Sequence, residues 1–329
     1  MKPLSDVRVV GTSFVVSIMD VVFNFAIAII TGSTVMLAQG LQGLSDLITG
    51  GMLYFGVKRS KRSPTHKYQF GFGREVFFWV LMAGILMFIG TGGLSFYFGL
   101  QQFRFPQPIE SVGLAFAMLT IGITANGYAL SLSIRRLKHL HHRTGWWQQL
   151  RRSSVAETKA TFLIDMLGTS SAILGFIALL VFAATNNPQF DGLGSMVIGV
   201  SMMAMSLLLM RDVRDLIVGR AVEPDVAQRI IGAAQSVPGV QSILDLRTMY
   251  LGSASILVIL EVHLRDGLDT DEIEAITDNV KEVVQENIPE VHHIQVEIET
   301  PDHELHSVKR RLKRSALSRR KKSIKFLDK

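Results

Sequence analysis

Six long apolar segments dominate the first two thirds of the chain. A membrane-spanning helix needs about 20 mostly apolar residues, because the hydrocarbon core of a bilayer is about 30 Å thick. The segments that reach this length with few charges are 9–30, 34–57, 76–100, 111–134, 161–184 and 193–210. We therefore expect an α-helical membrane protein with six transmembrane helices over residues 1–217.

The loops between these segments differ in charge. Six Lys or Arg lie in 58–75 and seven in 135–160, whereas Arg104 is the only basic residue on the opposite side. Cytoplasmic loops carry the excess of Lys and Arg, so both chain termini are expected to be cytoplasmic. The stretch 139–152 contains two tryptophans beside basic residues and predicts a short interfacial helix, with a plain basic loop as the alternative.

The pattern changes to that of a water-soluble domain after about residue 218. Periodicity and turn residues predict, in order, a helix to about 236, strands over 240–249 and 256–264, a helix over 270–287 and a strand over 292–299. We expect a small cytoplasmic α/β domain over 218–302 with an αββαβ, ferredoxin-like order and both helices on one face of the sheet.

The last residues, 303–329, hold eleven Lys or Arg against two acidic residues. We expect a basic, disordered tail that contacts anionic lipid rather than nucleic acid, since Phe326 is its only aromatic residue.

Composition excludes several functions. The chain has 329 residues, a net charge of +6 and no cysteine, which removes disulfides, thiolate zinc sites and cysteine nucleophiles. No Ser-His-Asp set, dinucleotide fingerprint or zinc-hydrolase motif is present. We expect neither an enzyme nor a cofactor-binding protein.

Three aspartates lie inside the apolar segments: Asp20, Asp46 and Asp165. A charged group in a span costs about 2.5–3.5 kcal/mol, so each is a candidate site. Each has a polar residue one helical turn away, on the same face; these neighbours are Asn24, Gln42 and Thr161. The pattern indicates an oxygen-lined cation site that also binds protons, or else interhelical hydrogen bonding, which we favour for Asp20.

The glycines that follow two of these aspartates indicate close helix packing. Gly50 and Gly51 follow Asp46, and Gly168 follows Asp165. We expect the second and fifth segments to approach each other closely at these positions.

A weaker signal lies in the soluble domain. Glu261 and His263 alternate on one predicted strand, as Glu297 and Glu299 do on another, so each pair shares a face. A solvated sheet face explains them, and a weak metal site is the alternative.

The whole chain resembles the cation diffusion facilitator family. The segments 44–46, 68–71, 106–110, 191–195 and 219–220 look like the branch that contains the mitochondrial zinc transporter nine of animals. The resemblance implies a homodimer, joined partly through the soluble domains, that exports divalent metal, usually zinc, from the cytoplasm in exchange for protons.

The resemblance also implies a transport site at Gln42, Asp46, Thr161 and Asp165, and soluble-domain metal positions near Leu244, Glu261, Glu297 and Glu299. Glutamine and threonine replace the imidazole that favours zinc. Oxygen ligands suit manganese, magnesium, iron or cobalt as well.

We therefore expect a proton-coupled exporter of zinc, manganese, iron, cobalt or magnesium in a bacterial inner (plasma) membrane. A non-transporting scaffold or metal-responsive regulator with a degenerate site is one alternative. A monovalent cation/proton antiporter is another.

Overall fold

A computed structural model describes the backbone of residues 6–140, 156–253 and 255–300, and the side chains of 17–135, 162–253 and 255–300. The chain forms two compact units, one up to Ile217 and one from Val218 onward. The predicted basic tail, and all but the first two residues of the predicted interfacial helix 139–152, lie outside the described residues.

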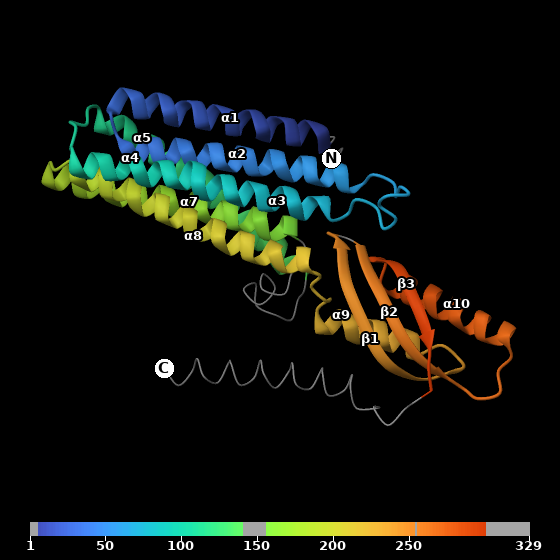
Figure 1. Cartoon of the computed structure of the whole chain (residues 1–329). Helices are drawn as coiled ribbons and strands as arrows, with labels where there is room; N and C mark the ends of the chain where they lie inside the picture. The colour runs from blue at the N-terminus through green and yellow to red at the C-terminus, as the bar shows by residue number, and fades with distance from the viewer. Residues whose placement is uncertain (1–5, 141–155, 254, 301–329) are drawn as a thin grey trace, which may run out of the picture. The chain divides into compact units, whose positions relative to one another are not determined.

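The first unit is a bundle of long helices that run side by side (Figure 1). A π-helical segment joins α3 to α4, so that Glu75–Arg104 forms one continuous helix. The elements are α1 (Asp6–Thr31), α2 (Thr34–Ser60), α3 (Glu75–Ile85), η1 (Leu86–Gly92), α4 (Gly93–Arg104), α5 (Val112–Leu140), α7 (Ala156–Thr185) and α8 (Gln189–Val218).

Four of the six predicted spans are confirmed as helices long and apolar enough to cross a membrane: Glu75–Arg104, Val112–Arg135, Phe162–Thr185 and Gln189–Val218. The described part of α1, Ser17–Thr31, is apolar but shorter. The helix α2 has 27 residues but is not among the four, because buried glutamines, Asp46 and the terminal Lys58 and Arg59 lower its hydropathy. The helix α2 therefore has more buried polar side chains than an ordinary membrane span.

The core of the bundle forms around α2, which contacts α1, α3, α4 and α7. Val35, Met36 and Ala38 of this helix are fully buried, together with Leu179 and Ile198 from the helices α7 and α8. Large apolar side chains such as Ile29 and Ile89 point outward instead and are 84% and 70% exposed. Apolar groups on both the inside and the outside are typical of a bundle surrounded by lipid.

One carboxylate fixes the beginning of α2. Asp191, in the first turn of α8, is fully buried and accepts four hydrogen bonds from the start of α2. The hydroxyls of Ser33 and Thr34 donate at 2.5 and 2.7 Å, and the backbone amides of Thr34 and Val35 donate at 2.6 and 3.2 Å. Asp191 thus satisfies amides that a helix N-terminus otherwise leaves without partners.

Small residues bring α4 and α8 into backbone contact. A Cβ atom on Gly99 would lie 2.7 Å from the carbonyl oxygen of Gly192, and one on Gly199 would lie 2.6 Å from the amide of Phe96. Between them, the Ser195 hydroxyl donates to the Ser95 carbonyl at 2.9 Å. This close approach depends on glycine.

The second unit confirms the predicted αββαβ order. It consists of α9 (Pro224–Gln235), β1 (Val240–Gly252), β2 (Ser255–Leu264), α10 (Thr270–Asn287) and β3 (Val291–Ile298). The three-stranded sheet has the order β1-β2-β3, with β1 antiparallel and β3 parallel to the central β2. Every second residue of β2 is buried, because α9 and α10 cover one face of the sheet.

Candidate metal-binding site

Asp46 and its neighbour Gln42 form the centre of the site. The Gln42 amide nitrogen donates a 2.6 Å hydrogen bond to Asp46 Oδ2, as the one-turn spacing on α2 predicts. The hydroxyl of Ser171, on α7, donates to the Gln42 amide oxygen at 2.8 Å. The amide of Gln42 therefore connects Asp46 to α7. The second oxygen of Asp46, Oδ1, is buried without a hydrogen-bond partner among the described residues.

Asp165 comes to the same region from α7. The hydroxyl of Ser133, on α5, donates a hydrogen bond to its carboxylate. Asp46 and Asp165 are close enough for their charges to interact. Thr161 lies one turn before Asp165 on α7, and its side chain is outside the described residues. The structure thus brings together three of the four predicted site residues.

Asp20 joins this group from α1. Its charge also interacts with that of Asp46. The Asn24 amide donates to the Asp20 backbone carbonyl at 2.9 Å. A cavity of about 30 Å³ lies beside Asp46, between α1, α2 and α5, and its polar lining residues are Asp20, Asn24, Gln39, Gln42, Asp46 and Asn126. Asp20 therefore lies near the Asp46 carboxylate and lines a cavity, in addition to its hydrogen bond with Asn24.

Sequence reasoning missed four polar residues that surround these carboxylates: Gln39, Asn126, Ser133 and Ser171. Gln39, Gln42 and Asp46 follow an i, i+3, i+7 spacing, so the pattern on α2 could have revealed the first of them. Asn126 and the two serines lie on other helices, and their place depends on how the helices pack.

Glycine brings α7 close to this site at one of the three predicted positions, Gly168, but not at the other two. A Cβ atom on Gly168 would lie 3.1 Å from the Asn126 side chain and 3.3 Å from the Gln42 amide nitrogen. Gly50 and Gly51 have open space beside them. The close approach predicted at these two glycines is wrong, because α2 and α7 meet at the level of Gln42 instead.

Oxygen and amide groups dominate the site. Within the part of the chain that the structure describes, no three His, Asp or Glu side chains are grouped so that they would hold a metal ion by themselves. A cation between Asp46 and Asp165 would therefore need neutral oxygens to complete its coordination.

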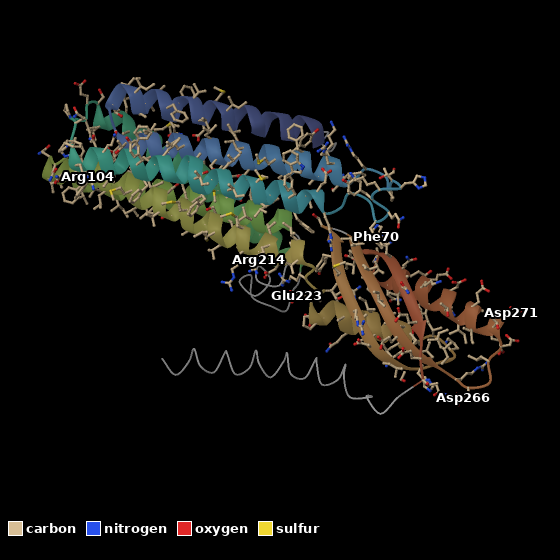
Figure 2. All side chains as sticks on the ribbon, viewed as in Figure 1. Phe70, Arg104, Arg214, Glu223, Asp266 and Asp271 are labelled. Carbon is tan, nitrogen blue, oxygen red and sulfur yellow. The ribbon has the colours of Figure 1, made fainter. Side chains whose placement is uncertain are left out.

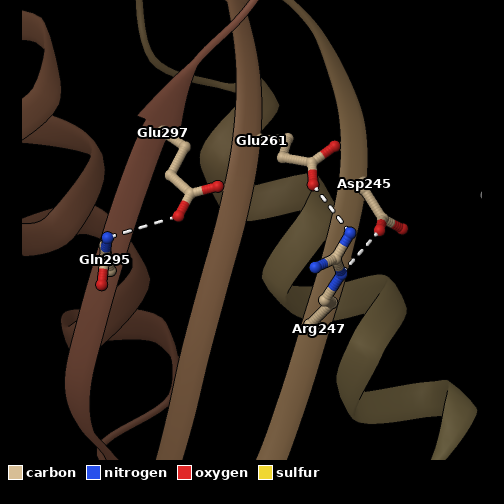
Figure 3. Close-up of polar contacts among 5 residues, drawn as sticks. All are labelled: Asp245, Arg247, Glu261, Gln295 and Glu297. Carbon is tan, nitrogen blue, oxygen red and sulfur yellow. Dashed lines mark hydrogen bonds and ion pairs between the residues drawn. The ribbon is translucent and has the colours of Figure 1, made fainter.

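The candidate residues of the soluble domain occupy the sheet face away from the helices. Asp245, Glu261 and Glu297 are neighbours across the three strands. Arg247 lies among them, with its Nε 3.1 Å from Asp245 and its Nη2 3.2 Å from Glu261 (Figure 3). Glu297 instead accepts a 3.3 Å hydrogen bond from Gln295. Arg247 thus forms ion pairs with both Asp245 and Glu261.

The other two candidates in this domain lie one step further along the same strands. The His263 ring contacts the backbone carbonyl of Glu299 at 3.3 Å, and the Glu299 amide donates to Val262. Neither contact uses the Glu299 carboxylate.

Burial and the carboxylate of Asp245 raise the pKa of Glu261, although the Arg247 charge opposes this. The hydrogen bond to Asp245 raises the pKa of the Arg247 guanidinium. The cluster therefore keeps its arginine charged and holds one carboxylate that binds protons more readily than a free glutamate.

Basic residues lie at both ends of the helical bundle. Arg104 marks one end and Arg214 the other (Figure 2). Beyond Arg214, the second end also carries Lys58 and Arg59 in the last turn of α2. Lys58 and Arg59 begin one of the two basic loops from which the sequence predicts orientation.

Two family models match the two units of this architecture. The model of a cation efflux transmembrane domain matches residues 11–218, and the model of a cation efflux protein cytoplasmic domain, named as a dimer domain, matches 222–301. A solved MamM CTD in its cadmium form is 25% identical, with a TM-score of 0.23, over 24% of this chain and 98% of that one.

Curated relatives have the names of transporters, in agreement with the expectation of a protein that is not an enzyme. The mitochondrial proton-coupled zinc antiporter SLC30A9 of Xenopus laevis is 25% identical over 84% of this chain and 51% of its own length. The zinc transporter ZitB of Escherichia coli is 24% identical over 70% of this chain and 69% of its own length. The chain spans about half the length of the mitochondrial relatives, whose branch is the one the sequence predicts.

Proposed function

Because this chain belongs to the cation efflux family, we propose that it is a membrane exporter that exchanges a divalent metal ion for protons. The observation that carries the proposal is the pairing of Asp46 and Asp165 on neighbouring helices, in a bundle that otherwise buries apolar side chains. Two carboxylates supply the charge that a dication needs. The proton-coupled antiporters among the relatives support the same exchange.

In this proposal Asp46 and Asp165 bind the ion directly. Asp46 Oδ1 has no hydrogen-bond partner among the described residues and is available to the metal. Asp46 Oδ2 gives up its hydrogen bond from Gln42 to bind the metal, and the Asp165 carboxylate gives up its hydrogen bond from Ser133. The Gln42 amide turns its oxygen from Ser171 to the ion, and Thr161 adds a hydroxyl from α7. Ligands on separate helices allow helix movement to open the site to one side at a time.

The same carboxylates carry the exchanged protons. The sequence places no histidine in the six apolar segments, so no imidazole is available there as a proton carrier. When the metal leaves, protons neutralise the carboxylates of Asp46 and Asp165. The site without metal then faces the cytoplasm again at a lower cost in free energy. Metal and protons therefore compete for one pair of groups.

The set of ligands bears on the choice of metal. Zinc is the cargo named for the relatives. An imidazole ligand would favour zinc over other divalent metals. A site made only of oxygen ligands lacks this preference and also binds manganese, iron, cobalt or magnesium. We propose that the site accepts these harder ions alongside zinc.

We further propose a homodimer with both chain termini in the cytoplasm and α1 and α2 as the two remaining spans. The match to a cation efflux dimer domain supports the dimer. The excess of Lys and Arg in the loops 58–75 and 135–160 supports the orientation, and a bacterial inner membrane is our proposed location.

Uptake of metal into everted membrane vesicles with an acidic interior tests the proposal. Wild-type vesicles should accumulate Zn²⁺ or Mn²⁺, and Asp46→Asn and Asp165→Asn should abolish uptake while the protein stays folded and dimeric. Asp215→Asn, which removes an exposed carboxylate near the end of α8, is the matched control. Uptake like that of the wild type in either site variant would contradict the assignment.

The same vesicles separate the alternatives. A folded, dimeric protein that moves no ion would favour a scaffold or regulator. Proton movement driven by Na⁺ in the absence of divalent metal would favour a monovalent cation antiporter.

A further inference from the structure

The cavity beside Asp46 is lined by residues of three helices, and Asp165 is not one of them. Its lining comes from α1, α2 and α5, whereas Asp165 belongs to α7. Asp46 therefore has two neighbouring carboxylates on two different helices, Asp165 and Asp20.

The walls of the cavity are unusually polar for the inside of an apolar bundle. Besides the two carboxylates, the cavity is lined by the side-chain amides of Asn24, Gln39 and Asn126. Its volume of about 30 Å³ corresponds to roughly one water molecule, or to an ion that has lost most of its hydration.

Two of the lining residues each have a buried atom without a hydrogen-bond partner among the described residues: Gln39 Nε2 and Asp46 Oδ1. The Gln39 side chain is only 6% exposed, so bulk water does not satisfy it. Buried polar groups nearly always have a partner, and one left without is a sign of a bound species. A cation bound to Asp46 Oδ1 satisfies the carboxylate, and a water molecule beside it in the cavity accepts a hydrogen bond from the Gln39 amide.

We infer that Asp20, Asp46 and the amides of Asn24, Gln39 and Asn126 form a second binding position for a partly hydrated divalent cation, next to the Asp46–Asp165 pair. The inference rests on the proposed function and deepens it. Asp46 belongs to both positions, so an ion passes between them without losing this ligand. Oxygen ligands and retained water suit Mn²⁺ or Mg²⁺ better than Zn²⁺.

Binding of Mn²⁺ to the full-length protein in lipid nanodiscs tests the second position. Free Mn²⁺ is followed by its paramagnetic resonance signal in the background of Asp165→Asn, which disrupts the first position. This variant should still bind Mn²⁺. Adding Asp20→Asn should weaken the binding about 10- to 100-fold, the usual effect of losing a group that supports a metal. Adding Asp215→Asn instead should leave the binding unchanged.

A second variant tests the same position without removing a charge. Asn126→Leu keeps the branched shape and the number of heavy atoms of the side chain and removes the amide, so in the Asp165→Asn background it should also weaken Mn²⁺ binding. Asn126→Asp, which retains an oxygen, should restore it. These variants provide the result if Asp20→Asn fails to fold.

The outcomes distinguish this inference from the proposed function. Equal Mn²⁺ affinity with and without Asp20→Asn, or no binding by Asp165→Asn, would overturn the second position. The exporter proposal would still stand if the wild type moved metal into vesicles. A wild type that neither binds nor transports metal would overturn both.

Discussion

The amide nitrogen of Gln42 donates a 2.6 Å hydrogen bond to Asp46, one helical turn further along α2. The other end of the same amide accepts a hydrogen bond from Ser171 of α7. In the proposed transport site, Gln42 thus stabilises the Asp46 carboxylate by a hydrogen bond when no metal is bound. The exchange of this hydrogen bond for a metal ion is the step on which ion choice depends.

Replacing this glutamine should change the preferred metal. Gln42→His introduces an imidazole beside Asp46, and imidazole favours zinc over manganese. We expect the ratio of Zn²⁺ to Mn²⁺ affinity to rise by about tenfold, measured by competition binding to the purified protein. Gln101→His, at an exposed glutamine of α4, is the control. An unchanged ratio would show that residue 42 does not contact the ion.

The carboxylate of Asp191 should stabilise the bundle by holding the first turn of α2. Asp191→Asn keeps the shape of the side chain but removes the charge and one acceptor oxygen. We expect a loss of about 2 kcal/mol in the free energy of unfolding, since hydrogen bonds to charged groups are the stronger ones. Thermal unfolding in detergent measures the loss, with Asp215→Asn as control. Equal stability of the two variants would contradict the role of Asp191.

The glycine contact between α4 and α8 should not tolerate a side chain. Gly99→Ala places a Cβ atom 2.7 Å from the backbone of α8, so the helices must separate. Overpacking of this kind costs about 1–3 kcal/mol. Gly90→Ala, in the preceding η1 segment, meets open space and should leave thermal stability near that of the wild type. Equal effects of the two substitutions would argue against the contact.

The acidic sheet face should respond to pH when its arginine is removed. Arg247→Gln removes the charge that opposes the raised pKa of Glu261, so the pKa should rise further. A carboxyl group with a raised pKa binds protons more tightly in the folded state than in the unfolded state. Lowering the pH from about 7 to about 5 should therefore stabilise the variant more than the wild type.

Hydrogen–deuterium exchange of the β1 and β2 amides in the full-length protein measures this effect. Exchange in the variant should be faster than in the wild type at pH 7, and the difference should become smaller on acidification. A difference that is the same at both pH values would mean that Arg247 acts through packing rather than charge.

Much of this architecture could be predicted from the sequence, because it depends on local patterns. Period-two alternation predicts β2, and apolar length predicts four of the spans. The bond between Gln42 and Asp46 follows from one-turn spacing. Asn126, Ser133 and Ser171 could not be predicted, since their approach to the carboxylates depends on helix packing.

In the soluble domain, too, features that depend on local sequence pattern could be predicted and features that depend on strand pairing could not. The alternation of Glu261 and His263 places them on one face, but the role of Arg247 depends on the pairing of β1 with β2. This pairing shifts between Ile243 and Asp245. A shift in register changes which side chains are neighbours across strands, so a single sequence does not reveal an arginine beside Glu261.

The most direct test of the central claim uses proteoliposomes that contain a pH-sensitive dye and face Zn²⁺, Mn²⁺, Fe²⁺, Co²⁺, Mg²⁺ and Na⁺ in turn. Wild-type protein should give a change in internal pH with at least one divalent metal, and Asp46→Asn should give none. Folded, dimeric wild-type protein that gives no change with any ion, or an Asp46→Asn response equal to that of the wild type, would contradict metal–proton exchange at this pair of aspartates.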